Sequence, residues 1–167
     1  MKFIKYQQDV VKEVLKNNSK ARLMCWKEKD KYSSKTNAYC TIDSFLLMCI
    51  PEKLWVLDID RLKEHLGIKD GNTTLKNLVS FDGRMEAILA NEKRDEADRT
   101  GNKKRPVVKI KAVGDDTKFA WVNERLLKYF DNPTFTLSKE RPDISGINVY
   151  EGETFVGMVM PVRVSQI

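Results

Sequence analysis

The sequence predicts an α+β fold, and three observations support it. The two end segments, 1–51 and 106–167, share one predicted order of elements, which is a strand, a helix and three strands. A charge-rich middle segment, 52–105, separates them. We therefore expect a single domain over 1–167, built from two βαβββ halves and carrying an insert between them.

The first half, 1–51, is predicted to open with a short strand, MKFIKY. The next run, QQDVVKEVLKNN, takes a helical period, and its apolar stripe is Val11, Val14 and Leu15. ARLMCWKEK is predicted as a second strand. NAYCTID and SFLLMCIP indicate two more strands, with a tight turn at Asp43 and Ser44 between them.

The middle segment, 52–105, is predicted to be less regular. LWVLDIDRLKEHLG is typical of a strand entering a short helix, with Asp58 or Asp60 near the N-cap and Gly67 at its end. Residues 68–105 hold few hydrophobic side chains and include the run NEKRDEADRTGNKKRP. We expect residues 68–105 to be exposed and partly mobile.

The second half, 106–167, repeats the opening order. VVKIKAV and KFAWV alternate as strands around a turn at Gly114, and NERLLKYF then has a helical stripe with Asn123 as N-cap. TFTLSKE, GINVYEG and TFVGMVMPVRV indicate three further strands. From helix start to closing proline, the two halves span 41 and 37 residues, which suggests a duplication. Chance similarity is the alternative, because identity between the halves is low.

Two short patterns in the second half point to a known family. An N-x-x-L-L helix comprises Asn123, Leu126 and Leu127, and a closing Met-Pro-x-Arg strand comprises Met160, Pro161 and Arg163. In order and spacing, residues 107–164 resemble the closing section of the bacterial DNA polymerase sliding clamp, the beta subunit. The first third is similar more loosely, and 52–105 does not match.

The resemblance implies a DNA-clamp fold, in which duplicated βαβββ halves place two sheets outside two adjacent helices. Rings of such domains close around duplex DNA in that family. Clamp chains carry several domains, whereas this chain holds one, so a ring would require a homo-oligomer. The resemblance also implies that Met160, Pro161 and Arg163 help to form a hydrophobic groove for peptides of replication proteins. The extra tail, 165–167, could cover this groove.

Basic side chains are candidates for contact with the phosphates of double-stranded DNA. Those of the first helix are spaced by four residues, those of the second by three, and those of the insert are consecutive: Lys12, Lys16 and Lys20; Arg125 and Lys128; Lys103, Lys104 and Arg105. Such side chains can bind phosphates without reading bases. Asp9, Glu13 and Glu124 are interleaved with them, so ordinary solvated helix faces are the alternative.

Composition permits a polyanionic partner and disfavours a membrane protein. The chain has 41% hydrophobic and 32% charged residues and a formal net charge of +6. Its longest apolar run, 45–51, is far shorter than the ~20 residues that cross a bilayer. Trp26, Trp55 and Trp121 lie in predicted strands and are expected in the core rather than as stacking platforms. We expect a cytoplasmic protein.

The sequence contains few residues of the types that enzymes use for catalysis. There is one histidine, His65, and Cys25, Cys40 and Cys49 show no metal-binding spacing, so we expect three reduced thiols. No phosphate-cradling glycine motif occurs. Asp58 and Asp60 could hold Mg²⁺ with a third acid, but helix capping also accounts for them. We therefore expect no catalysis, metal or cofactor. The predicted function is a sliding-clamp-like role in DNA replication or repair; the alternative is a clamp-fold regulatory module that binds protein and not DNA.

Overall fold

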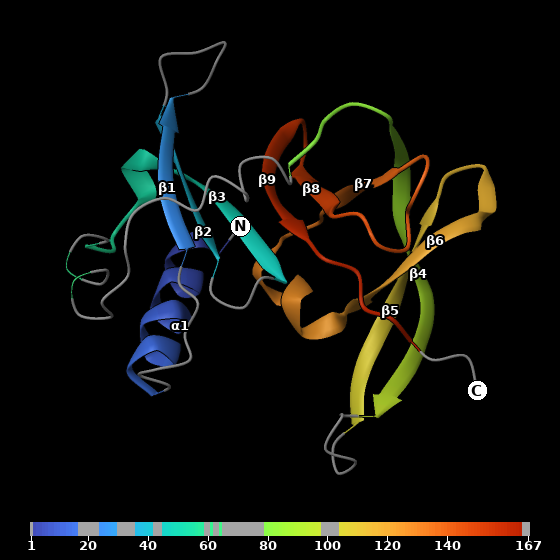
Figure 1. The fold of residues 1–167 in the computed structure, drawn as a ribbon, viewed down its shortest axis with the longest axis horizontal. Helices are drawn as coiled ribbons and strands as arrows, with labels where there is room; N and C mark the ends of the chain where they lie inside the picture. Colours follow the sequence, from blue (N-terminus) through green and yellow to red (C-terminus); the bar gives the residue numbers. More distant parts are fainter. Residues whose placement is uncertain are drawn as a thin grey trace. The chain divides into compact units, whose positions relative to one another are not determined.

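The fold is seen in a computed structural model that describes residues 2–16, 24–29, 36–41, 45–58, 61, 64, 79–97 and 104–164. The chain divides into two units, Met1–Leu78 and Val79–Ile167. The boundary between them falls inside the segment that was predicted to be an insert. Each unit has its own secondary structure, drawn in Figure 1.

The first unit consists of one α-helix followed by three antiparallel strands. Its elements are α1 (Phe3–Lys16), β1 (Met24–Lys29), β2 (Thr36–Thr41), β3 (Leu46–Pro51) and the short 3₁₀ helix η1 (Glu52–Leu54). β2 pairs with both β1 and β3, so the order is β1-β2-β3. The helix and these three strands were predicted, whereas the turn at Asp43 and Ser44 lies outside the described residues.

The predicted opening strand is wrong, because α1 already begins at Phe3. Tyr6, Gln7 and Val10 are buried, and their spacing of i, i+1 and i+4 places them on one helical face. The helical spacing of buried residues begins inside MKFIKY, and it determines the structure of this segment in place of the short alternation of apolar and polar residues that predicted a strand. The Tyr6 hydroxyl donates to the Leu46 carbonyl oxygen at 3.4 Å, which ties α1 to β3.

Gln7 anchors α1 to the chain that follows β3. Its Nε2 donates to the Leu54 carbonyl oxygen at 2.8 Å, and its Oε1 accepts from the Val56 and Leu57 amides at 2.8 and 3.2 Å. Leu54, Val56 and Leu57 therefore have backbone groups paired with a helix side chain and not with a neighbouring strand, and the strand predicted over 54–57 is wrong. Asp58 Oδ1 accepts from the Arg61 amide at 3.0 Å, as expected of an N-cap, whereas Asp60 and Gly67 lie outside the described residues.

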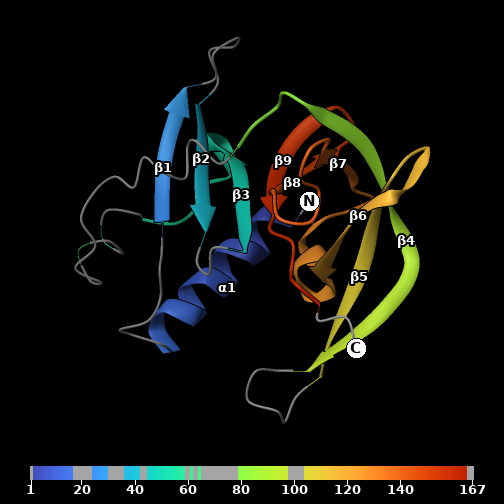
Figure 2. The ribbon, with the colours of Figure 1, turned by 45° about the vertical axis from the view of Figure 1, so that its right-hand side comes forward.

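The second unit is dominated by antiparallel strands. These are β4 (Arg84–Ala97), β5 (Lys104–Ala112), β6 (Asp115–Asn123), β7 (Thr134–Ser138), β8 (Ile147–Glu151) and β9 (Thr154–Val159), with the 3₁₀ helix η3 (Glu124–Tyr129) after β6. Their order is β9-β8-β7-β4-β5-β6. Figure 2 shows β4 as a long, curved strand.

The exposed insert predicted over 68–105 is wrong for 84–97 and 104–105, which lie in β4 and β5. β4 pairs with β7 on one side and β5 on the other, and Ala87 has Cα partners on both, Phe135 and Ala112. Most β4 side chains after Ala87 are exposed or half-buried. The backbone of β4 is therefore paired although many of its side chains are charged and exposed. A hydrophobic pattern alone does not predict such a strand.

The second predicted α-helix is replaced by η3, a 3₁₀ helix of six residues. The predicted cap is confirmed, because Asn123 Oδ1 accepts from the Arg125 amide at 3.0 Å. Asn132, with a φ of 48°, and Pro133 follow soon after. A pair of adjacent α-helices, one from each half, is therefore not formed by the described residues.

The core of the second unit includes residues from both faces of its strands, since the consecutive residues 147–149 of β8 are all fully buried. Six fully buried side chains come from five strands: Ile110, Val122, Leu137, Ile147, Val149 and Val159. The predicted turn at Gly114 is present, a further turn lies at Gly152, and both glycines have positive φ, 80° and 60°. β9 ends at Val159, short of the predicted Val164.

No helix among the described residues is long and apolar enough to cross a membrane.

Candidate nucleic-acid interface

The α1 lysines lie on the exposed side of the helix, as predicted, but acidic neighbours offset them. Lys12 and Lys16 are exposed. Lys12 Nζ lies 3.9 Å from Asp9 Oδ1, and Lys5 Nζ lies 3.6 Å from Asp9 Oδ2. Lys20 is outside the described residues. One carboxylate therefore neutralises part of this face.

The basic residues of η3 are also exposed. The Arg125 and Lys128 side chains face solvent, and Lys128 Nζ lies 4.6 Å from the centroid of the Tyr129 ring. Glu124, at the start of η3, accepts a hydrogen bond from Lys93 Nζ of β4 at 2.5 Å. This ion pair links η3 to β4 across a separation of 31 residues.

The consecutive basic residues of the predicted insert stand at the start of β5. Lys104 and Arg105 are exposed, and their Cα partners on β4 are Ala97 and Glu96. Lys104 Nζ lies 3.7 Å from Asp95 Oδ2, with both side chains largely in solvent. Such exposed pairs exchange readily for other anions, because they contribute at most about 1 kcal/mol. Lys103 lies outside the described residues.

Strand register brings two of the predicted clusters to the same end of the second unit. Val107 on β5 pairs with Arg94 on β4 and with Asn123 on β6, and η3 follows Asn123 directly. The start of β5, the last part of β4 and η3 therefore adjoin. We call their basic side chains the basic rim: Lys93, Arg94, Lys104, Arg105, Arg125 and Lys128.

The basic rim also contains acids, so its charge is only moderately positive. Glu92, Asp95, Glu96 and Glu124 lie on the same elements, four carboxylates against six cations. Lys12 and Lys16 belong to the first unit, so a surface shared by α1 and η3 stays a prediction. The rim is the basic arrangement that the second unit builds by itself.

Lys109 is the centre of a cluster on this sheet that was not predicted from the sequence. Lys109 Nζ lies 4.3 Å from the Phe119 ring centroid, 5.9 Å from that of Trp121 and 3.0 Å from Glu92 Oε2. Trp121 is half-buried beside this lysine rather than fully buried in the core. The alternation in VVKIKAV and KFAWV carries the signal, because it separates Lys109 and Trp121 from the buried Ile110 and Val122.

The residues of the implied peptide groove follow β9 and lie outside any strand. Met160 and Pro161 are half-buried, and Arg163 is exposed. The Val162 amide donates to the Trp121 carbonyl oxygen at 2.8 Å, so this segment is held against β6. The apolar residues are thus partly accessible, as docking would require.

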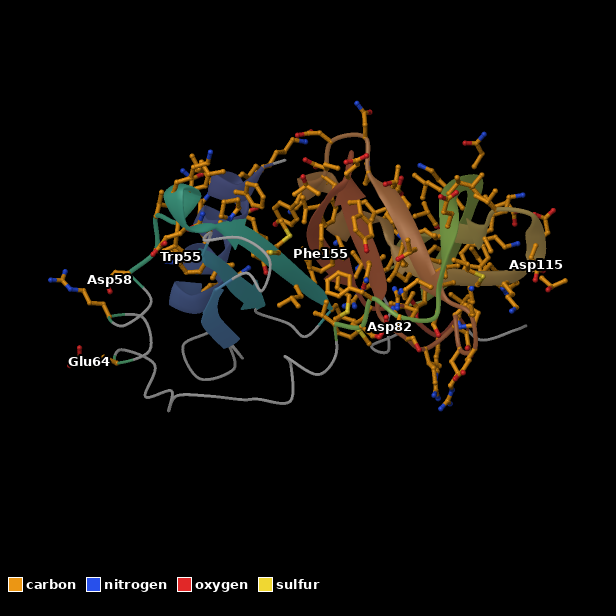
Figure 3. The ribbon with its side chains drawn as sticks, turned by 90° about the horizontal axis from the view of Figure 1, so that it is seen from above. Trp55, Asp58, Glu64, Asp82, Asp115 and Phe155 are labelled. Atoms are coloured by element: carbon orange, nitrogen blue, oxygen red, sulfur yellow. The ribbon has the colours of Figure 1, made fainter. Side chains whose placement is uncertain are left out.

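The acidic pair considered from the sequence is only partly described, because Asp60 lies outside the described residues. Within the described ranges, no three His, Cys, Asp or Glu side chains gather as a metal site would require. Asp58 and Glu64, in the first unit, are exposed (Figure 3). Cys49 is a buried free thiol, as predicted, while the side chains of Cys25, Cys40 and His65 lie outside the described part.

Comparison with known proteins does not identify a family. No protein-family model, curated protein or solved structure matches the chain. Function is therefore inferred from the charges and contacts of the chain's own residues.

Proposed function

We propose that this protein is a non-enzymatic, sliding-clamp-like protein of DNA replication or repair, which contacts the phosphates of double-stranded DNA through the basic rim. The observation that carries the proposal is the register of β4, β5 and β6, which gathers Lys104, Arg105 and Arg125 at one end of the second unit. Contacts of this kind are independent of base sequence, as movement along a duplex requires.

The order of elements supports the clamp resemblance. A helical element precedes three antiparallel strands in each unit, α1 before β1, β2 and β3, and η3 before β7, β8 and β9. This shared order is expected of duplicated halves. With one such pair of halves in the chain, encircling a duplex requires several copies, so a homo-oligomer is part of the proposal. Partner replication proteins would dock at Met160, Pro161 and Arg163.

The test is a salt titration of binding to a labelled random-sequence duplex, followed by fluorescence anisotropy. Arg105→Glu combined with Arg125→Glu should weaken binding and reduce the slope of log K against log salt by about 2, because each lost phosphate contact removes about 0.9. Lys139→Glu combined with Arg141→Glu is the matched control. It makes the same charge change at exposed positions of the same unit and should bind with a slope closer to that of the wild type.

Separate variants assign the contributions of the two units. Lys12→Glu combined with Lys16→Glu tests whether α1 joins the interface, as the clamp arrangement requires. Equal losses in the rim variant and its control would mean that only net charge matters, and would contradict the proposal. Incubation of the duplex with the protein and Mg²⁺ should leave the DNA uncut; cleavage would exclude a non-enzymatic role.

A regulatory module that binds protein and not DNA is the second candidate, favoured by the segment 160–164. Its Met160 and Pro161 are partly accessible although the backbone is fixed at Val162. If the wild type fails to bind any duplex at low salt, this candidate replaces the first. Met160→Asp should then abolish capture of the partner while leaving the melting temperature nearly unchanged.

A further inference from the structure

A second cationic site lies in the second unit, away from the residues used above. Arg84, at the start of β4, is half-buried, and its Nη2 donates to the carbonyl oxygens of Thr136 and Gly146 at 2.7 and 2.6 Å. Its Nε donates to Thr136 Oγ1 at 3.3 Å. All these acceptors are neutral, and no carboxylate among the described residues pairs with Arg84.

The lack of a counter-ion distinguishes Arg84 from the lysines of β4 and β5. Lys93, Lys104 and Lys109 each have a carboxylate within 3.7 Å. Burial lowers the pKa of Arg84, and the electrostatic interaction with Tyr150 raises it in part. An arginine guanidinium stays protonated at neutral pH. Arg84 is therefore a partly desolvated cation, and its two Nη1 hydrogens are available to donate to an anion.

Aromatic contacts connect Phe81 with Tyr150, the residue that interacts electrostatically with Arg84. Phe81, three residues before Arg84, packs edge-on against Phe155 with 5.1 Å between ring centroids, and Phe155 contacts Tyr150 at 5.8 Å. Phe81 is 57% exposed. Figure 3 shows Phe155 and Asp82, the residue after Phe81, in the same region of the second unit.

A buried polar atom marks the same face of the strands. Thr136, which accepts from Arg84, has Asn148 as its Cα partner on β8. Asn148 is fully buried, and its Nδ2 donates to the Ser80 carbonyl oxygen at 2.9 Å. Its Oδ1 has no hydrogen-bond partner. An acceptor left without a donor is costly, so a donor group from a ligand or a solvent molecule is expected nearby.

We propose that Phe81, Arg84 and Tyr150 form a binding site for single-stranded nucleic acid, in which Arg84 holds a phosphate and the exposed Phe81 ring stacks on the adjacent base. A nucleotide combines an anion with a flat ring, and this site offers a cation three residues along the chain from an exposed aromatic ring. An acidic peptide would satisfy the charge and leave the ring unused. The site goes beyond the duplex contact of the basic rim and does not depend on it.

The experiment measures binding of a labelled oligothymidine of about 12 nucleotides, a length within the usual site size of such surfaces. Phe81→Ala should weaken binding about tenfold, and Phe81→Leu should not restore it, because stacking requires a flat ring. Phe45→Ala is the matched control, since it removes an aromatic ring of similar exposure, 48%, in the first unit and should bind as the wild type does.

Arg84→Lys tests the phosphate contact while keeping the charge, and melting temperatures establish that each variant is folded. This variant should also bind more weakly, because lysine lacks the planar fork of donors. Wild-type affinity in Phe81→Ala, or full rescue by Phe81→Leu, would overturn the proposal. So would equal competition by an oligoglutamate peptide. The rim variant Arg105→Glu with Arg125→Glu should keep the Phe81 effect, so the single-strand and duplex proposals can fail separately.

Discussion

The two units use the same order of elements to build different structures. In the first, α1 precedes β1, β2 and β3; in the second, η3 precedes β7, β8 and β9. The helix has 14 residues in the first unit and six in the second. A 14-residue α-helix presents a long buried face, whereas a six-residue 3₁₀ helix cannot cover a sheet. Chain order therefore does not determine how each unit completes its core.

In the second unit, additional strands take the place of a long helix. β4, β5 and β6 extend the β7, β8 and β9 meander, and they supply buried residues such as Ile110 and Val122. In the first unit, Tyr6 and Val10 come from the helix instead. This contrast yields three predictions, which concern the Gln7 anchor of the first unit and, in the second unit, the packing at Gly146 and the β5–β6 hairpin.

The largest effect is expected at Gln7, the polar anchor of the first unit. Gln7→Ala removes the partners of the Leu54 carbonyl and of the Val56 and Leu57 amides. These backbone groups are partly buried, and a typical hydrogen bond contributes about 1 kcal/mol, so the loss of three bonds should lower the free energy of unfolding by about 3 kcal/mol in chemical denaturation. The exposed neighbour gives the control, since Gln8→Ala should change stability by less than about 0.5 kcal/mol. Similar small losses in both variants would show that α1 does not depend on this anchor.

A smaller effect is expected where the second unit packs a loop against β9. A Cβ added at Gly146 would lie 2.2 Å from Met158 Sδ, and Met158 is buried. Gly146→Ala should destabilise by about 1–3 kcal/mol, the usual cost of overpacking. A double-mutant cycle with Met158→Ala isolates this contact. If the penalty persists at full size after Met158 is truncated, the steric explanation is wrong.

The smallest effect concerns the β5–β6 hairpin, which precedes η3, whereas no described strand precedes α1 in the first unit. Hydrogen bonds from the Thr117 hydroxyl and amide hold the pKa of Asp115 below its ordinary value. The resulting stabilisation is present above the unfolded pKa of about 3.9 and is lost as pH falls through the lower folded pKa. Figure 3 shows Asp115 at one end of the second unit, and its partner Thr117 is exposed, so the contribution is small.

Thr117→Val tests this account by NMR titration of the Asp115 carboxyl. The variant removes the hydroxyl donor and keeps the amide, so the pKa of Asp115 should move up toward its ordinary value. Thr134→Val, at another exposed threonine of the same unit, should leave it in place. An unchanged Asp115 titration in Thr117→Val would assign the shift to the backbone amide alone.

Periodic segments could be predicted from the sequence, and the missed elements have identifiable causes. β5 to β9 and the Asn123 cap follow alternation and turn residues that the sequence displays. β4 was not predicted because side chains such as Glu92 and Lys93 are exposed, whereas its pairing with β5 and, over 84–87, with β7 is made by the backbone. The α-helical expectation for ERLLKY failed because its stripe is only six residues long and ends before Asn132 and Pro133.

Parts of the candidate sites could likewise be predicted from the sequence, and other parts could not. Lys104, Arg105, Arg125 and Lys128 were selected from local charge, and each is exposed. Their convergence could not be predicted, because it depends on the pairing of Val107 with Asn123 across β5 and β6. Arg84 carries no local signal at all, since its special environment comes from carbonyl groups of residues 136 and 146.

The hydrogen bond from the Val162 amide to the Trp121 carbonyl has a protective consequence. β6 is the outermost strand of its side of the sheet, and an outermost strand offers unsatisfied backbone groups as a template for other chains. The segment after β9 occupies that position at Trp121. A truncation that removes Val162 would uncover this template, and the shortened protein would then be prone to stack strand upon strand into aggregates.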